Sequence, residues 1–186
     1  MSEHVCPWWI GYFLVSPIRR WMQNPDDLIA PYVSPGMTVL EPGPGMGFFT
    51  LPLARRVGSG HVIAVDIQPK MLSALRRRAT RAGLIQRIET RLAKPDSLGI
   101  DDLQGNVDFI LAVAMVHEMP SAESFFRQAA AALASGGRLL LSEPAGHVSE
   151  AKFAEELNWA RRAGLAVKDR PAIKRFHTAL LAKEAQ

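Results

Sequence analysis

Cysteine is almost absent from this chain of 186 residues, in which Cys6 is the only one. A single cysteine excludes an internal disulfide framework and suits a reducing compartment. Long apolar runs are also missing, since the longest early run, Trp8 to Val15, is far shorter than the roughly 20 residues that cross a bilayer. That run is a poor signal peptide as well, because Glu3 stands where a positive segment belongs. We therefore expect no membrane association and a cytoplasmic location.

Neither sign of charge dominates the sequence, in which 22 lysines and arginines stand against 18 acidic residues, for a formal net charge of +4. With 48% hydrophobic and 22% charged residues, the composition is that of an ordinary globular protein. The length fits one domain. We expect this domain to cover residues 1–186, with an aromatic- and proline-rich helical extension over 1–35 and a core over 36–186.

From Met37 onward, apolar β-branched segments alternate with amphipathic ones. The sequence predicts strands over Met37–Glu41, His61–Asp66, Arg87–Leu92, Val107–Ala114, Arg138–Glu143, Ala166–Arg170 and Phe176–Ala182. Helices are predicted between most of them, one opened by Pro69 and two capped by Ser121 and Ser149. Strands that alternate with helices are typical of a parallel sheet. We therefore expect an α/β fold: a doubly wound, mostly parallel seven-stranded sheet with helices on both faces and a C-terminal antiparallel hairpin.

The sharpest motif follows the first predicted strand, where the segment Glu41–Gly47 reads EPGPGMG and places three glycines at alternate positions. Glycines allow positive φ angles and a close approach of a ligand to the backbone. A helix that begins near Gly47 would add free N–H groups. Asp66 ends the second strand about 20 positions later, where a carboxylate binds ribose hydroxyls in such folds. The pattern indicates a nucleotide-type site, and a tight turn with a helix-capping aspartate is the alternative.

The glycine spacing does not fit a dinucleotide site. The dinucleotide fingerprint is G-x-G-x-x-G, but the sixth position counted from Gly43 is Phe48. An acid followed by x-G-x-G-x-G, as in Glu41–Gly47, resembles the class I S-adenosylmethionine-dependent methyltransferases instead. The resemblance covers residues 37–183, and the predicted C-terminal hairpin is similar to the hairpin that ends the fold of that family.

The resemblance implies S-adenosylmethionine as cofactor and S-adenosylhomocysteine as product. It also implies which residues hold the cofactor. The loop would cradle the methionine part, Asp66 would bind the ribose and Ile67 would pack on the adenine. Asp96 would meet the adenine amino group, with Ser97 next to it in the cofactor site. A carbonyl near Ala112, at the end of the fourth strand, would accept from the methionine ammonium. The implied cofactor site therefore comprises Glu41, Gly43, Pro44, Gly45, Gly47, Asp66, Ile67, Asp96, Ser97 and Ala112.

Residues for the methyl acceptor are expected where the fourth and fifth strands end. His117 is a candidate general base near neutral pH, with a hydrogen-bonded histidine at a helix start as the alternative. Glu118 and Glu143 are candidates to bind substrate. The aromatic residues Trp8, Trp9 and Tyr12 would either form a lid over the acceptor or simply pack on the sheet. No metal site is expected, because His4 and Cys6 have no second close pair of such residues.

Three functions remain open at this point. The first is methyl transfer to a small molecule, favoured by the minimal core and the aromatic N-terminal segment. The second is methyl transfer to RNA, suggested by the basic cluster over Arg76–Arg81. The third is cofactor binding without catalysis. The sequence predicts no particular oligomeric state.

Overall fold

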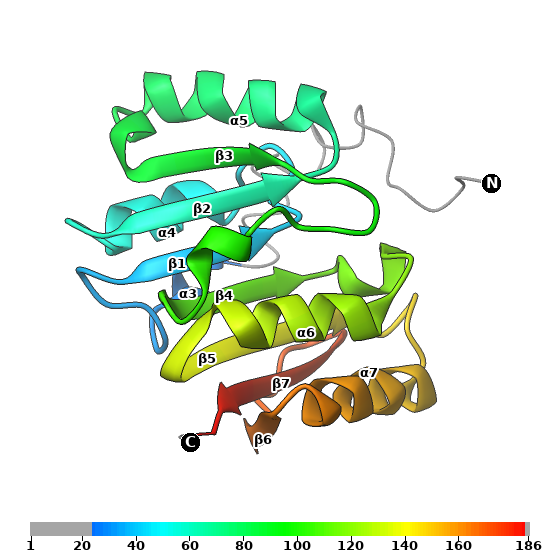
Figure 1. Cartoon of the computed structure of the whole chain (residues 1–186). Helices are drawn as coiled ribbons and strands as arrows, with labels where there is room; N and C mark the ends of the chain where they lie inside the picture. Colours follow the sequence, from blue (N-terminus) through cyan, green and yellow to red (C-terminus); the bar gives the residue numbers. More distant parts are fainter. Residues whose placement is uncertain (1–23, 185–186) are drawn as a thin grey trace. The chain divides into compact units, whose positions relative to one another are not determined.

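The computed structural model describes residues 24–184. Trp8, Trp9 and Tyr12, the predicted lid residues, lie outside this range, as do His4 and Cys6. The strands follow the order β3-β2-β1-β4-β5-β7-β6 in a seven-stranded sheet (Figure 1). The chain divides into two compact units, Met1–Ala93 and Lys94–Gln186.

The first unit holds three parallel strands with helices between them. Its elements are α3 (Pro25–Ile29), β1 (Thr38–Pro42), α4 (Thr50–Arg56), β2 (His61–Asp66), α5 (Pro69–Arg81), the 3-10 turn η1 (Ile85–Arg87) and β3 (Ile88–Leu92). Strand β2 is paired in parallel with β1 on one side and β3 on the other. Residues 62–65 of this strand are buried, as expected of a central strand covered on both faces. Both α4 and α5 pack on β2.

The second unit begins with a parallel pair and ends in a hairpin. Its elements are η2 (Asp101–Leu103), β4 (Val107–Val113), η3 (Val116–Glu118), α6 (Ala122–Ala132), β5 (Leu133–Pro144), α7 (Glu150–Arg162), β6 (Leu165–Asp169) and β7 (Phe176–Lys183). Strands β4 and β5 are parallel, whereas β7 is antiparallel to both β5 and β6. The predicted fold class, mostly parallel with an antiparallel C-terminal hairpin, is confirmed.

Local sequence signals explain where the helices of the second unit begin. Ser121 precedes α6, and its hydroxyl accepts a hydrogen bond from the N–H of Ser124 at 3.1 Å. Ser149 precedes α7 and accepts in the same way from the N–H of Lys152 at 3.2 Å. Each cap satisfies an N–H that would otherwise lack a partner, as predicted from the sequence.

Several predicted strand ends differ from the structure by one residue, and two predicted boundaries are wrong by three residues or more. Helix α4 begins at Thr50 rather than near Gly47, because the loop glycines have positive φ angles that a right-handed helix does not allow. Strand β5 begins at Leu133 rather than at Arg138. Its pairing with β4 shifts register between Val107 and Phe109, so β5 carries a bulge that the sequence shows only as a glycine pair.

Candidate functional site

The glycine loop of the first unit leaves β1 at Pro42 and is shaped by three left-handed residues. Gly43, Gly45 and Gly47 have φ angles of 69°, 54° and 87°. The N–H of Gly43 donates to the carbonyl of Val65 at 2.9 Å, so the loop is fixed to the end of β2. Side chains rarely adopt these φ angles, which explains the alternate glycines.

The glycines differ in what surrounds them. A Cβ atom built on Gly45 meets nothing within 4 Å, whereas one built on Gly47 would lie 2.4 Å from Cδ1 of Leu75. Gly47 therefore lets the loop pack against α5, while the space beside Gly45 is open to a ligand.

Asp66 holds the loop and the end of β2 together. Its side chain is largely buried, with the residue 7% exposed. Oδ1 accepts a hydrogen bond from the N–H of Gln68 at 2.8 Å, and Oδ2 accepts one from the N–H of Gly45 at 3.3 Å. Asp66, which is predicted to bind the ribose, thus contacts the glycine loop that is predicted to hold the methionine part of the cofactor. Next to it, Ile67 is 44% exposed, so an apolar surface is available for the adenine that it is predicted to contact.

Glu41 is a buried acid without a cationic partner among residues 24–184. It is 3% exposed, and its Oε2 atom has no hydrogen-bond partner in the described part of the chain. Burial raises the pKa of Glu41 to about 8, although the nearby Thr50 hydroxyl works against this, and the charge of Asp66 raises it further. A buried carboxyl that lacks a cation fits a site for a positively charged ligand.

Arg78 of α5 stabilises the glycine loop. Its guanidinium donates a hydrogen bond to the carbonyl of Met46, and partial burial lowers its pKa. In the sequence, Arg78 belongs to a basic cluster, and nothing there predicted this contact. The signal was its position, because Met71, Leu75 and Arg78 follow the i, i+4, i+7 spacing of one helix face.

The other predicted cofactor residues lie in the second unit. Asp96 is exposed in a tight turn, closed by two backbone hydrogen bonds between Lys94 and Ser97 of 2.9 and 3.2 Å. The Ser97 hydroxyl accepts from the N–H of Gly99 at 3.1 Å. Ala112 is fully buried in β4. Two residues later, Ala114 has a φ of 54°, and such strain in a non-glycine residue is common at functional sites. This feature was not predicted from the sequence.

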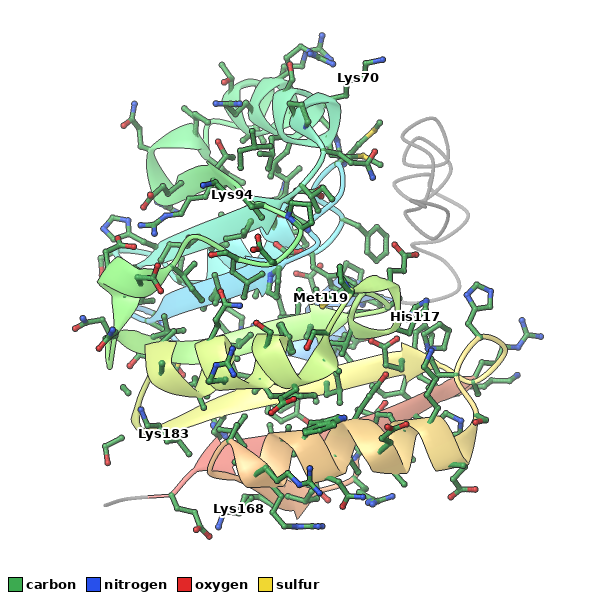
Figure 2. All side chains as sticks on the ribbon, turned by 45° about the vertical axis from the view of Figure 1, so that its right-hand side comes forward. Lys70, Lys94, His117, Met119, Lys168 and Lys183 are labelled. Carbon is green, nitrogen blue, oxygen red and sulfur yellow. The ribbon has the colours of Figure 1, made fainter. Side chains whose placement is uncertain are left out.

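His117 lies on the turn that follows β4 (Figure 2), and a buried acid holds its ring. Nδ1 of His117 is hydrogen-bonded to Oε2 of Glu143, which is fully buried in β5. The other carboxylate oxygen accepts from the N–H groups of Val116 at 2.8 Å and Met115 at 3.3 Å. Glu143 therefore fixes the ring and the turn, and its predicted contact with substrate stays a prediction.

The second ring nitrogen of His117, Nε2, faces another acid. This atom lies 4.0 Å from Oε1 of Glu118, and the His117 side chain is 12% exposed. The hydrogen bond to Glu143 raises the pKa of His117, burial opposes the rise, and the charges of Glu143, Glu118 and Glu156 add to it. A histidine that a carboxylate holds through one ring nitrogen is the usual arrangement of a general base, which acts through its other nitrogen.

Glu156 is a second buried acid in this region, and it is not among the residues predicted from the sequence. It is 3% exposed, and neither carboxyl oxygen has a hydrogen-bond partner within residues 24–184. Burial raises its pKa to about 7, and the charge of Glu143 adds to the effect, while His117 and Lys152 oppose it. Its position three residues after Phe153 on the inward face of α7 was the available signal.

The sheet order and a glycine loop after β1 with an acid at the end of β2 define the class I fold of S-adenosylmethionine-dependent methyltransferases. A family model described as "Methyltransferase domain" matches residues 39–137, and the chain belongs to this family. S-adenosylmethionine is the cofactor that membership implies. Among the residues described, none of the helices is long and apolar enough to cross a membrane, and no three His, Cys, Asp or Glu side chains are placed to hold a metal ion.

Similar proteins differ in the acceptors that their names state. The chain is 33% identical over 121 residues to an arsenite methyltransferase of Halobacterium salinarum, covering 64% of this chain and 30% of that protein. It is 32% identical over 146 residues to a ribosomal protein L11 methyltransferase of Pelotomaculum thermopropionicum, covering 77% and 42%. The chain thus spans less than half the length of these curated relatives. A methyltransferase structure from Aquifex aeolicus has the same fold, with a TM-score of 0.84 and 21% identity over 96% of this chain and 98% of that one.

The residues present fit S-adenosylmethionine. The cofactor is a cation. When bound, it would supply a methyl group attached to a sulfonium sulfur, and the thioether that remains after transfer is a good leaving group. Glu41 offers a buried carboxyl, Gly45 offers open space, and Asp66 offers a carboxylate for hydroxyl groups. Because the methyl group is already activated, the chain's own residues need only position the acceptor and, where the acceptor carries a proton, remove it.

We expect Asp66→Ala to weaken S-adenosylmethionine binding by about 1.5–3 kcal/mol, because a charged hydrogen-bond acceptor for the cofactor is lost. The same change removes the acceptor for the N–H of Gly45 and so loosens the loop. Calorimetric titration measures the effect, with Asp27→Ala, an exposed aspartate of α3, as the matched control. An affinity unchanged in Asp66→Ala and in Asp66→Asn would contradict the assignment.

Proposed function

We propose that this chain transfers a methyl group from S-adenosylmethionine to a small-molecule acceptor. The observation that carries the proposal is the His117–Glu143 pair. The His117 side chain is only 12% exposed, and so small an exposed area favours a compact acceptor over a folded macromolecule. One relative is named as an arsenite methyltransferase, and arsenite is a small molecule, which is consistent with a small-molecule acceptor here.

His117 acts in this proposal as the general base. Its Nε2 atom takes a proton from the acceptor while Glu143 holds Nδ1 and stabilises the imidazolium that forms. Glu118, whose Oε1 atom lies 4.0 Å from Nε2, orients the acceptor in this proposal. Water is kept from Glu143, which is fully buried, so the pair keeps its strength.

The alternative of an RNA acceptor has less support. The basic cluster over Arg76–Arg81 suggested this alternative, but the Arg78 guanidinium donates a hydrogen bond to the carbonyl of Met46. Arg76, Arg77 and Arg81 are exposed, so RNA transfer would still predict binding that falls steeply with salt. Cofactor binding without catalysis predicts no turnover with any acceptor.

The test is transfer of labelled methyl from S-adenosylmethionine into cell extract separated into small-molecule, RNA and protein fractions. The proposal predicts that label enters the small-molecule fraction. Label only in RNA or protein would assign a different acceptor class. If the chain binds the cofactor but no fraction is labelled, the proposal is wrong and the chain binds S-adenosylmethionine without catalysing methyl transfer.

Once an acceptor is known, His117→Asn should reduce kcat by roughly 10²–10⁴-fold, the usual contribution of general base catalysis. The affinity for S-adenosylmethionine should stay the same, because His117 is absent from the glycine loop. His61→Asn, an exposed histidine at the start of β2, is the matched control. A kcat that His117→Asn leaves unchanged would show that no base acts here.

The pH profile of kcat offers a separate check. Because the pKa of His117 is raised, its neutral form appears only as the pH rises through that elevated value, so the rate should climb on the alkaline side of the ordinary histidine range. Glu143→Gln removes the charge that raises this pKa, so the acidic limb should move to lower pH. A limb that stays in place in Glu143→Gln would contradict the role given to the pair.

A further inference from the structure

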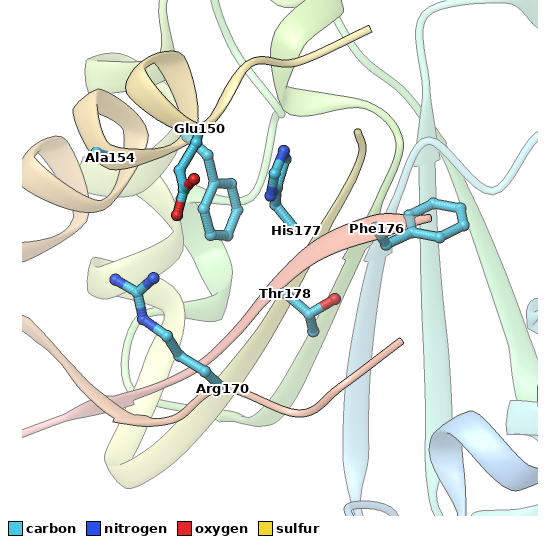
Figure 3. Close-up of a pocket in the computed structure, with 7 residues that line it drawn as sticks. Glu150, Ala154, Arg170, Phe176, His177 and Thr178 are labelled. Carbon is cyan, nitrogen blue, oxygen red and sulfur yellow. The ribbon is translucent and has the colours of Figure 1, made fainter. Parts of the chain in front are cut away.

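A pocket of about 350 Å³ lies in the second unit, where the first turns of α7 face the start of β7 (Figure 3). Its size is at the lower end of that of small-molecule sites, which enclose roughly 300–1,000 Å³. The pocket is lined by aromatic rings and by charged groups of both signs, and none of its residues is among the site residues predicted from the sequence.

Two stacked rings provide a flat surface in this pocket. Phe153 of α7 and His177 of β7 have ring centroids 5.5 Å apart and planes inclined by 28°. Phe153 is buried, so the stack is held rigidly against the sheet, while His177 is partly exposed. Phe176, also partly exposed, contributes to the lining. Such a surface suits an aromatic ring, which gains from offset stacking.

Two opposite charges stand over this surface. Figure 3 shows the Glu150 carboxylate and the Arg170 guanidinium pointing toward one another from α7 and from the segment after β6. Both residues are exposed, and the two side chains form no hydrogen bond or ion pair with any residue between 24 and 184. An acid and a base that share a pocket without pairing match a ligand that carries both charges.

We propose that this pocket binds a small aromatic amino acid. Its ring would lie against the Phe153–His177 stack, its carboxylate on Arg170 and its ammonium on Glu150. Guanidinium groups bind carboxylates through two parallel hydrogen bonds, which gives the contact a definite orientation. A ligand with only an anionic group would face repulsion from Glu150, and one with only a cationic group would face repulsion from Arg170. The site goes beyond the proposed methyl transfer and does not depend on it.

The pocket also lies close to the candidate base along the strands. His177 of β7 is paired directly with Glu143 of β5, which holds His117. Side chains that are opposite each other on antiparallel strands lie on the same face, about 5 Å apart. A bound ligand would therefore contact the residue next to the acid that positions His117.

Calorimetric titration of the full chain with L-phenylalanine tests the site. Ala154→Trp should abolish binding, because Ala154 lines the pocket from an exposed helix position where a large ring fits without disturbing the core. Ala151→Trp makes the same change on the same helix outside the pocket lining and should leave binding unchanged. Equal binding in wild type and Ala154→Trp would overturn the proposal, as would the absence of binding to wild type at millimolar L-phenylalanine.

The two charges are tested separately. Arg170→Gln and Glu150→Gln should each weaken L-phenylalanine binding at least 10-fold, with Lys168→Gln and Glu155→Gln as exposed controls. Phenethylamine, which lacks the carboxylate, and 3-phenylpropionate, which lacks the amine, should each bind wild type at least 10-fold more weakly than L-phenylalanine.

If instead Arg170 and Glu150 merely attract one another, each substitution would lower the melting temperature and leave the affinity unchanged, which would overturn the proposal. Equal binding of either analogue would do the same. Because no methyl transfer is needed, a negative result here leaves the methyltransferase proposal standing.

Discussion

Gly45→Val should abolish S-adenosylmethionine binding and leave the fold largely intact. Gly45 has a φ of 54°, which valine rarely adopts, so the loop would have to shift. A Cβ atom at this position meets no protein atom within 4 Å, so the added side chain would instead occupy the space left for the ligand. We expect an affinity at least about 100-fold lower, equivalent to about 2.7 kcal/mol. Calorimetric titration gives the affinity, and a thermal melt followed by circular dichroism reports the fold.

The control for this prediction separates backbone strain from loss of the site. Gly105 has a φ of 69° and equally open surroundings but lies in the second unit, outside the loop and outside the predicted cofactor residues. Gly105→Val should therefore cost similar stability and leave the affinity unchanged. Gly47→Ala should mainly lower the melting temperature, because its Cβ would collide with Leu75. If Gly45→Val binds S-adenosylmethionine as wild type does, the loop is only a turn.

Glu41→Gln should stabilise the protein at alkaline pH and lower its affinity for S-adenosylmethionine. The pKa of Glu41 is raised from 4.5 to about 8, so folding favours the protonated form. Its contribution to stability is complete below pH 4.5 and is lost as the pH rises to about 8. Glutamine is neutral throughout, so the variant should be more stable than wild type at pH 8 or above, by an amount on the order of a few kcal/mol. The cationic cofactor would lose its buried carboxylate, so its affinity should fall.

Urea denaturation at pH 5 and at pH 8.5 measures this difference. Wild type and Glu41→Gln should be close in stability at pH 5 and diverge at pH 8.5. Glu156, with a pKa near 7, adds a dependence of the same sign that the variant retains. Glu123→Gln, an exposed acid of α6, should show no such divergence. A Glu41→Gln protein that binds S-adenosylmethionine as tightly as wild type would remove Glu41 from the site.

Much of the fold could be predicted because it depends on local patterns. The apolar segment of β2 gives its bounds to the residue, and serine caps mark where α6 and α7 begin. The alternation of strands and helices, followed by two strands without a helix, predicts the sheet and its hairpin. These features follow from hydrogen bonding and periodicity within short segments, which are visible in one sequence.

The parts that escaped prediction depend on contacts between distant segments. The start of α4 was misplaced because the φ angles of the loop follow from its attachment to β2, through Gly43 and Asp66. Arg78 and Glu156 look like surface charges in the sequence, but in the structure Arg78 is half-buried and Glu156 is buried. The bond between His117 and Glu143 joins residues 26 positions apart in the sequence. The sequence placed both at strand ends but did not show that they meet.

The most direct test of the central claim is calorimetric titration of the folded wild-type chain with S-adenosylmethionine, S-adenosylhomocysteine and NAD. The Glu41–Gly47 loop and Asp66 predict that the first two bind at one site per chain and that NAD does not bind. Binding of NAD, or no binding of S-adenosylmethionine to a chain shown to be folded by its thermal melt, would contradict the account.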